Sequence, residues 1–317
     1  MTENYHNLSL EDQAAAAMTL NEQGLTCMSN GDFYGAISYH EQALQLMTAI
    51  CGEESLDVVW VMKHIALMYE NMGEYSEALA LYEKVLFLRK HILGENHEYV
   101  ATSLTDLALL LAKMKNYDVA FQLHTDAFQI RQCLLDQHPA TAISLNNLGT
   151  VCYQMKHYDA ALDYYSRAYD MKRACGVTGH TIATTLLNMS VVLNEKGVYN
   201  DAVPCLIEAQ RVCDNTLMAE DAPVYMMIKN LQSKIDYKRS LIMQSMETSE
   251  MQIEPTQDVE RVEQNIFGLV ERSGSNTSNE SNDSDNTHQE IPLLSRGSTG
   301  MYDDDDMLEE NLLFLLC

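Results

Sequence analysis

Apolar residues recur along this chain at the three- and four-residue intervals of an α-helix, and regularly spaced turns interrupt them. In one stretch Val59, Met62, Ala66 and Tyr69 keep this interval, and Gly73 then supplies a helix stop. A second apolar series with the same period begins directly after that turn. The pattern predicts a hairpin of two antiparallel helices.

The hairpin pattern occurs five times, and in each copy an aromatic residue follows the turn and an alanine comes three residues later. The aromatic residues, spaced 42, 42, 41 and 41 apart, are Phe33, Tyr75, Tyr117, Tyr158 and Tyr199. A hairpin of this kind cannot bury its apolar face alone, so neighbouring hairpins must stack. The sequence therefore predicts an all-α fold, a right-handed superhelix (α-solenoid) of five hairpins.

The five units resemble tetratricopeptide repeats, which usually have about 34 residues, with each helix lengthened by about one turn. Links with the pattern Gly-x-x-His-x-x-Val-Ala are similar to those of the kinesin light chain family, and nephrocystin-like adaptors carry similar long repeats. The segments that carry this resemblance are 94–101 with 104–108, 138–142 with 145–149, and 180–183 with 186–190. The resemblance implies a protein-binding solenoid. Residues 1–10 show no counterpart of the long coiled coil with which kinesin light chains begin.

Four regions are expected along the chain. They are a short N-terminal arm (1–10), five tetratricopeptide hairpins (11–215), a capping helix (216–243), and a disordered acidic tail with a short amphipathic C-terminal motif (244–317). The tail holds 17 acidic and 3 basic residues, and its serine- and asparagine-rich centre has too few apolar residues to form a core.

The charge of the whole chain limits its partners. It has 46 acidic and 20 basic residues, whereas nucleic-acid binders need a clustered basic surface. No segment reaches the ~18–20 consecutive apolar residues of a membrane span, and residues 1–10 lack a secretory signal. The eight cysteines are scattered, as in reduced proteins. We therefore expect a cytoplasmic protein that binds neither nucleic acid nor membrane.

No catalytic signature is present in the sequence. We find no His-Glu-x-x-His pair, no phosphate-binding loop, no nucleophile elbow and no dinucleotide fingerprint. The sequence therefore predicts a protein that is not an enzyme and needs no cofactor or metal.

Candidate binding residues lie nine positions before each turn, in the first helix of each hairpin, which lines the concave face of such a solenoid. All five are polar: Glu22, His64, Asp106, Asn147 and Asn188. The family resemblance implies that Asn147 and Asn188 hydrogen-bond the backbone of an extended peptide, because a side-chain amide both donates and accepts. The alternative is that these polar residues cap or bridge adjacent hairpins.

Neighbouring inward candidates are Lys63, Lys113, Asn146 and Tyr153. With His64, the two lysines would give the early groove a positive patch that attracts acidic peptides, unless they belong to a solvated outer face. Cargo peptides of the kinesin light chain family place an aromatic residue beside acids. The chain's own tail has the same composition at Tyr302, which precedes four aspartates, so it is a second candidate ligand.

These observations favour a protein-protein interaction scaffold that holds an extended segment of a partner. The alternative function is a kinesin light chain-type cargo adaptor, associated with kinesin or another cytoskeletal complex in microtubule-based transport. A third function, an acidic activation-type nuclear protein, rests on the tail alone.

Overall fold

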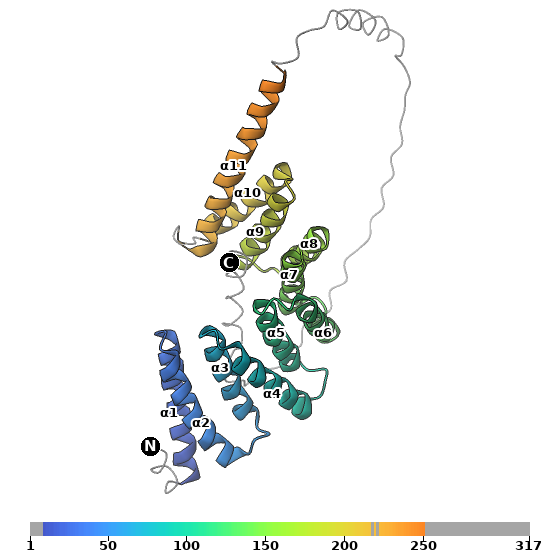
Figure 1. Ribbon diagram of the computed structural model, residues 1–317. Coiled ribbons are helices and arrows are strands. Elements are labelled where there is room, and N and C mark those ends of the chain that lie inside the picture. Colours follow the sequence, from blue (N-terminus) through green and yellow to red (C-terminus); the bar gives the residue numbers. More distant parts are fainter. Residues whose placement is uncertain (1–8, 217–218, 220–221, 251–317) are drawn as a thin grey trace, which may run out of the picture. The chain divides into compact units, whose positions relative to one another are not determined.

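The structure is a computed structural model that describes residues 9–216, 219 and 222–250. This part of the chain contains eleven helices and no strand (Figure 1). They are α1 (Leu10–Ser29), α2 (Phe33–Cys51), α3 (Leu56–Asn71), α4 (Tyr75–Leu93), α5 (Glu98–Lys113), α6 (Tyr117–Leu135), α7 (Pro139–Gln154), α8 (Tyr158–Ala174), α9 (His180–Glu195), α10 (Tyr199–Asn215) and α11 (Pro223–Glu250). The all-α prediction is confirmed.

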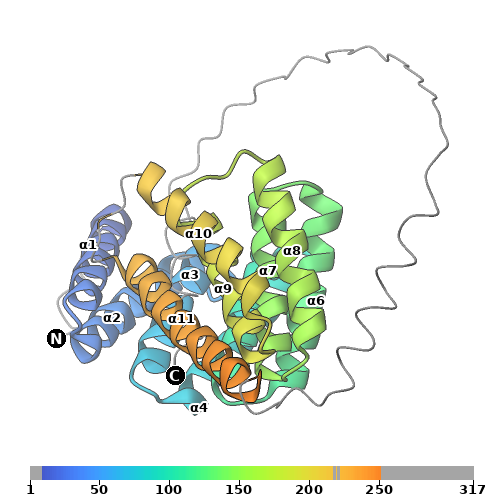
Figure 2. The same ribbon diagram turned by 90° about the horizontal axis from the view of Figure 1, so that it is seen from above.

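Ten of these helices form the five predicted hairpins. From α1 to α10, each helix packs against the next one along the chain, both within a hairpin and between hairpins (Figure 1, Figure 2). The two first helices α7 and α9 also touch each other. Each hairpin therefore buries its apolar residues against its neighbouring hairpins, as stacking requires.

The turn inside each hairpin has a left-handed residue at the same place. Gly31, Gly73 and Gly197 have φ angles of 76°, 81° and 76°, and Lys115 and Lys156 take the same conformation at 65° and 62°. A residue in this conformation after a helix lets the following N–H groups bond back to the helix carbonyls. In the first hairpin, for example, the Asp32 N–H bonds to the Cys27 carbonyl. The five turns thus share one backbone conformation, and the aromatic residue follows at the same distance after each of them.

Within the hairpins, a small residue on the first helix faces a large one on the second. A Cβ on Gly149 would lie 2.8 Å from the ring of Tyr165, and a Cβ on Gly24 would lie 2.8 Å from the ring of His40. Both rings are buried. The missing side chain lets the two helices approach closely.

The histidines of the links begin the first helices. His97 and His138 are the N-cap residues of α5 and α7, and their Nδ1 atoms accept hydrogen bonds from the N–H groups of Tyr99 and Ala140 at 3.1 and 3.2 Å. In the sequence, His180 occupies the place in its link that His97 and His138 occupy in theirs. In the structure Gly179 is the N-cap and His180 is the first residue of α9, so this cap has no side-chain hydrogen bond.

Replacing His138 with alanine should lower the free energy of unfolding by about 1 kcal/mol, because the Ala140 N–H at the start of α7 loses its acceptor. His157 is the matched control, since it is the N-cap of α8 but its side chain makes no capping bond. Urea unfolding followed by circular dichroism measures both variants. Equal losses in the two alanine variants would contradict a capping role for His138.

The last helix, α11, continues to Glu250, past residue 243 where the sequence predicted that the capping helix ends. Met243, Gln244 and Met246 favour helix, which accounts for the extension. The first of two compact units includes α11 up to Gln232, and the second begins at Ser233. Within the first unit, the Tyr225 hydroxyl donates to Asp214 at 3.2 Å. The predicted arm lies mostly, and the acidic tail from residue 251 onward lies wholly, outside the described residues.

Candidate functional site

The polar residues at the equivalent position of the first helices form what we call the polar strip: His64 on α3, Asp106 on α5, Asn147 on α7 and Asn188 on α9. They lie 42, 41 and 41 residues apart, so stacking of the hairpins gives each the same place on its helix. The corresponding residue of α1, Glu22, is exposed, whereas the other four side chains are at least largely buried. The strip therefore begins at the second hairpin.

The two asparagines of the strip are buried, and three of their four side-chain polar atoms have no partner among the described residues. Asn147 is 2% exposed and Asn188 is 1% exposed. Among the described residues, nothing accepts a hydrogen bond from the Asn147 Nδ2 group, and neither the Nδ2 nor the Oδ1 atom of Asn188 has a partner. Buried amides in folded proteins are nearly always hydrogen-bonded, so each unpaired group here needs an explanation. A bound peptide backbone, which offers both N–H and C=O groups, would supply it.

Lys63 and Lys113 do not form the positive patch that the sequence predicted. The Lys63 ammonium group lies 3.4 Å from the Asp106 carboxylate, and the Lys113 ammonium group lies 2.7 Å from the Glu70 carboxylate. Each pair brings opposite charges together, so neither lysine adds net charge to the strip. The sequence pattern did not reveal these pairings, although it had singled out Asp106 as a candidate binding residue.

His64 is packed among aromatic rings. Its Nδ1 atom lies 2.9 Å from the Trp60 carbonyl oxygen, and its ring centroid lies 3.8 Å from that of Trp60 and 5.7 Å from that of His40. Burial, followed by the charge of His64, lowers the pKa of His40 to about 4. This arrangement agrees with the bridging alternative for His64.

Asn146 also bridges hairpins. Its Oδ1 atom accepts a hydrogen bond from the Thr185 hydroxyl of the next first helix at 3.3 Å. Tyr153 is only half-buried, its ring centroid lies 6.0 Å from that of Tyr158, and burial raises its pKa. Of the eight predicted binding residues, the structure thus leaves unsatisfied amides at Asn147 and Asn188.

A second feature, which sequence reasoning missed, is a buried cation at three successive hairpin junctions. We call Arg89, Arg131 and Lys172 the junction cations; they are 3%, 2% and 4% exposed and lie 42 and 41 residues apart. Each one donates to a hydroxyl of the following first helix: Ser103 at 3.0 Å, Ser144 at 2.9 Å and Thr185 at 2.9 Å. The sequence does contain a signal for these cations, because they lie as far apart as the aromatic residues that follow the turns of the same hairpins.

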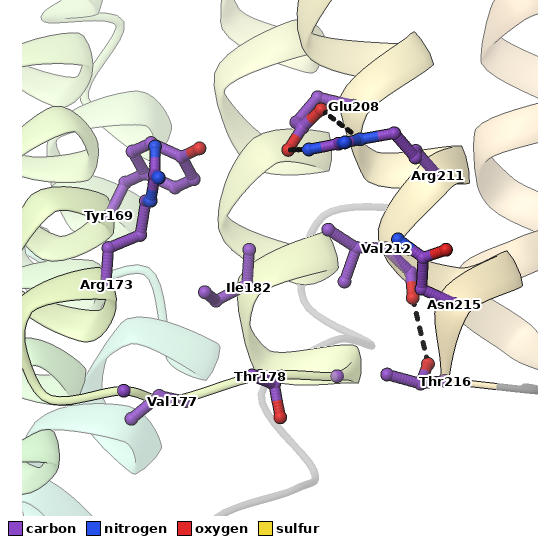
Figure 3. A pocket seen from close by; sticks show the side chains of 12 residues that line it. Tyr169, Arg173, Val177, Thr178, Ile182, Glu208, Arg211, Val212, Asn215 and Thr216 are labelled. Carbon is purple, nitrogen blue, oxygen red and sulfur yellow. Dashed lines mark hydrogen bonds and ion pairs between the residues drawn. The ribbon is translucent and has the colours of Figure 1, made fainter.

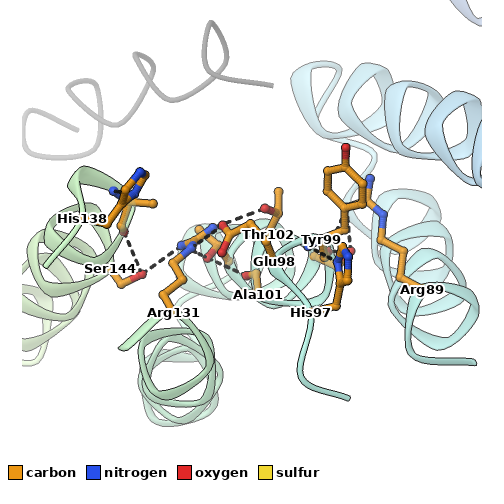
Figure 4. Close-up of polar contacts among 12 residues, drawn as sticks. Arg89, His97, Glu98, Tyr99, Ala101, Thr102, Arg131, His138 and Ser144 are labelled. Atoms are coloured by element: carbon orange, nitrogen blue, oxygen red, sulfur yellow. Dashed lines mark hydrogen bonds and ion pairs between the residues drawn. The ribbon is translucent and has the colours of Figure 1, made fainter. Parts of the chain in front are cut away.

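The three junction cations differ in their other partners. Arg131 makes an ion pair with Glu98 at 2.7 Å and also reaches hydroxyls of α5, as Figure 4 shows. Arg89 donates to the Tyr99 carbonyl at 3.1 Å (Figure 4), and Lys172 donates to the Thr181 carbonyl at 2.9 Å. Lys172 makes no ion pair with any described residue, and burial lowers its pKa to about 8. These contacts join each second helix to the next hairpin.

Other kinds of site are not seen in the described residues. No group of three or more histidine, cysteine or carboxylate side chains is placed to hold a metal ion within residues 9–216, 219 and 222–250. None of the helices in that part of the chain is long and apolar enough to cross a membrane. Its seven cysteines are all free thiols.

Comparison with solved structures supports the same fold. BtubC (BKLC) from P. vanneervenii is 20% identical over 68% of this chain and 96% of its own, with a TM-score of 0.55. A putative kinesin light chain of Podosopora anserina with nearly identical TPR-like repeats is 16% identical over 65% of this chain and 99% of its own, with a TM-score of 0.55. A Rap protein complexed with Competence and Sporulation Factor is 13% identical over 84% of this chain and 75% of its own, with a TM-score of 0.54.

Sequence comparison identifies the family. A search of curated protein sequences gave no match to this chain. The tetratricopeptide repeat family model matches residues 15–91, 64–132 and 99–174, which together span half of the chain. These matches and the kinesin light chain-like solenoids of similar fold confirm the predicted class and indicate a protein-interaction scaffold. The chain belongs to the tetratricopeptide repeat family.

Proposed function

We propose that this protein is a non-catalytic adaptor that holds an extended segment of a partner protein along the polar strip. The observation that supports this function is the pair of buried amides without partners at Asn147 and Asn188. An unpaired buried polar group costs about 1–3 kcal/mol, so the free protein carries an energetic penalty that a peptide backbone would relieve. The Rap structure with its bound factor is a case of a related solenoid fold with a ligand.

The chemistry of the strip favours recognition of the peptide backbone over recognition of charge. Lys63 and Lys113 are already paired with Asp106 and Glu70, so an acidic peptide gains little from them. Amide groups bond to any extended backbone. We therefore expect binding at the strip to depend only weakly on salt concentration, because screening acts on charged contacts.

The test replaces both asparagines with leucine, whose branched side chain has the same number of non-hydrogen atoms, in the full chain. Labelled decapeptides of acidic, neutral and basic composition, including the sequence of residues 301–310, are titrated by fluorescence anisotropy. We expect at least one peptide to bind and the double variant to raise its Kd about tenfold or more, since several backbone hydrogen bonds are lost. Asn200→Leu, at an exposed position on α10, is the matched control.

Urea unfolding of the same variants separates binding from a structural role. If the amides serve a ligand, the Asn147→Leu/Asn188→Leu protein should be more stable than the original by about 1–3 kcal/mol, because two unpaired amides leave the core. If the amides bridge hairpins, the double variant should be less stable. Loss of stability, or unchanged peptide binding, would contradict the proposed function.

A motor-linked role is the second candidate, favoured by the similar fold of the putative kinesin light chain. In this function the protein would join a cargo segment to a kinesin heavy chain in the cytoplasm. Co-purification of a kinesin heavy chain with the full chain at stoichiometric amount would support it. If no kinesin heavy chain co-purifies but peptides bind at the strip, the adaptor function would stand and the motor-linked role would not.

A further inference from the structure

A pocket of about 480 Å³ opens where the fourth hairpin meets the fifth (Figure 3). Its walls are α8 on one side and α10 on the other, and the loop 175–179 with the start of α9 forms its floor. We call it the α8–α10 pocket. It contains no residue of the polar strip. Its size falls in the usual range for a binding site, ~300–1,000 Å³.

The pocket exists because this junction is built differently from the one before it. Helix α8 has 17 residues where α6 has 19, and the loop to α9 spans residues 175–179 with left-handed glycines at Gly176 and Gly179. At the preceding junction the Arg167 guanidinium lies over the Phe128 ring at 5.9 Å. The residue 41 positions after Arg167 is Glu208, which instead turns to Arg211. Helix α10 therefore places no guanidinium group over the equivalent aromatic residue, Tyr169, in the way that Arg167 of α8 does over Phe128.

The pocket has a local excess of positive charge. Arg211 donates two hydrogen bonds to the Glu208 carboxylate, at 2.9 and 2.8 Å. Arg173 lies over the Tyr169 ring, 5.7 Å from its centroid, and makes no ion pair with any residue that the structure describes. Hydrogen bonding from Arg211, with a smaller contribution from the charge of Arg173, lowers the pKa of Glu208. Two guanidinium groups thus face one carboxylate in a chain whose net charge is −26.

The two arginines are particular to this junction. At the corresponding positions of the preceding junction, 41 residues earlier, the chain has Gln132 and Asp170. The repeats therefore accept uncharged or acidic residues at both places, so the arginines are not required for stacking. Apolar wall residues complete the pocket: Ile182 at the centre of the floor and Val212 on α10 (Figure 3).

We propose that the α8–α10 pocket binds an acidic segment of a protein, with a carboxylate paired to Arg173 and an adjacent aromatic or aliphatic side chain against Ile182 and Val212. A guanidinium group binds a carboxylate through two parallel hydrogen bonds, and Tyr169 holds the Arg173 side chain in place for this contact. The charge of the pocket is complementary to such a segment. This site is separate from the polar strip, so one molecule binds two segments.

The test uses anisotropy titration of a labelled peptide with the sequence of residues 301–310, which joins Tyr302 to four aspartates. All proteins are full-length and carry Asn in place of Asp at 303, 304, 305 and 306, so that the chain's own copy cannot compete. The test variant is Arg173→Gln, the residue of the preceding junction. Arg239→Gln, which removes an equal charge from an exposed position on α11, is the control.

If the pocket binds the peptide, Arg173→Gln should raise the Kd about tenfold, as loss of a charge-assisted pair does. Arg239→Gln should change the Kd less than about twofold, and raising salt from ~50 to ~300 mM should weaken binding. In the Asn147→Leu/Asn188→Leu protein, whose strip no longer takes up peptide, binding at the pocket should persist, and adding Arg173→Gln should still raise the Kd about tenfold.

Other results would overturn the proposal. They are no binding at about 1 mM peptide, equal Kd values for Arg173→Gln and the control, or loss of binding in the asparagine double variant. Full displacement of the peptide by ~10 mM acetate or phosphate would show a site for small anions only, because a peptide held by both charge and apolar contact resists such competition.

Discussion

Replacing Arg131 with alanine is expected to lower the free energy of unfolding by about 2–5 kcal/mol, the usual cost of truncating a large buried side chain to alanine. The Arg131 guanidinium donates to the Glu98 carboxylate and to three hydroxyls, on α5 and α7. Alanine would leave these groups without their donor and open a cavity between two hairpins. Urea unfolding of the full chain, followed by circular dichroism, measures the change.

Two further variants show how the loss at Arg131 arises. Arg131→Lys should cost less than Arg131→Ala, because Lys172 performs the same contact at the next junction with a single ammonium group. Arg167→Ala removes an exposed pair with Asp163, at 3.5 Å, and should cost less than about 1 kcal/mol. A loss for Arg131→Ala as small as that for Arg167→Ala would mean that the junction cations do not hold the hairpins together.

Replacing Tyr165 with alanine should lower the free energy of unfolding by about 3–5 kcal/mol through the cavity that it leaves. The ring is fully buried, packs where Gly149 has no side chain, and places its hydroxyl 3.1 Å from the Thr150 hydroxyl. Helices α7 and α8 cannot move together to fill the cavity left by alanine, because Gly149 already lets them pack at close distance. The same urea titration detects the loss.

Tyr165→Phe is the matched control for this prediction. It keeps the ring and removes only the hydroxyl, so it should cost about 0.5–1.5 kcal/mol. If alanine and phenylalanine destabilise the protein equally, the hydrogen bond to Thr150, and not the packing against Gly149, stabilises the hairpin.

The sequence was sufficient to predict the hairpins because their signals are local. The turn residue, the aromatic residue after it and the alanine three residues later lie within one short segment, and the structure places all five turns where these signals predict them. The link before α9 looks like the other two in the sequence, with His180 in the place of His97 and His138, but it caps its helix differently. Only the cap geometry, with Gly179 before the helix, distinguishes the two kinds of link.

The candidate site was harder to predict because its contacts join different repeats. Lys63 looked like a free charge, but its partner Asp106 lies in the next hairpin. The sequence pattern did not single out Arg131, because its partners come from the helices on both sides of it. Asn147 and Asn188 were identified through the family pattern. Their lack of partners could be read only from the structure.

The uneven polar contacts along the stack also bear on the order in which hairpins open. At the last junction Lys172 has no carboxylate partner among the described residues and Gly179 gives α9 no side-chain cap, whereas Arg131 and His138 supply both at the junction before. In a linear array each hairpin is held only by its neighbours, so the fifth hairpin should detach from the fourth at a smaller energetic cost than the fourth detaches from the third. A ligand that spans Asn147 and Asn188 would fasten that hairpin to the fourth. Part of the binding free energy would then go into suppressing this opening. The fifth hairpin would be more rigid when the strip is occupied than when it is empty.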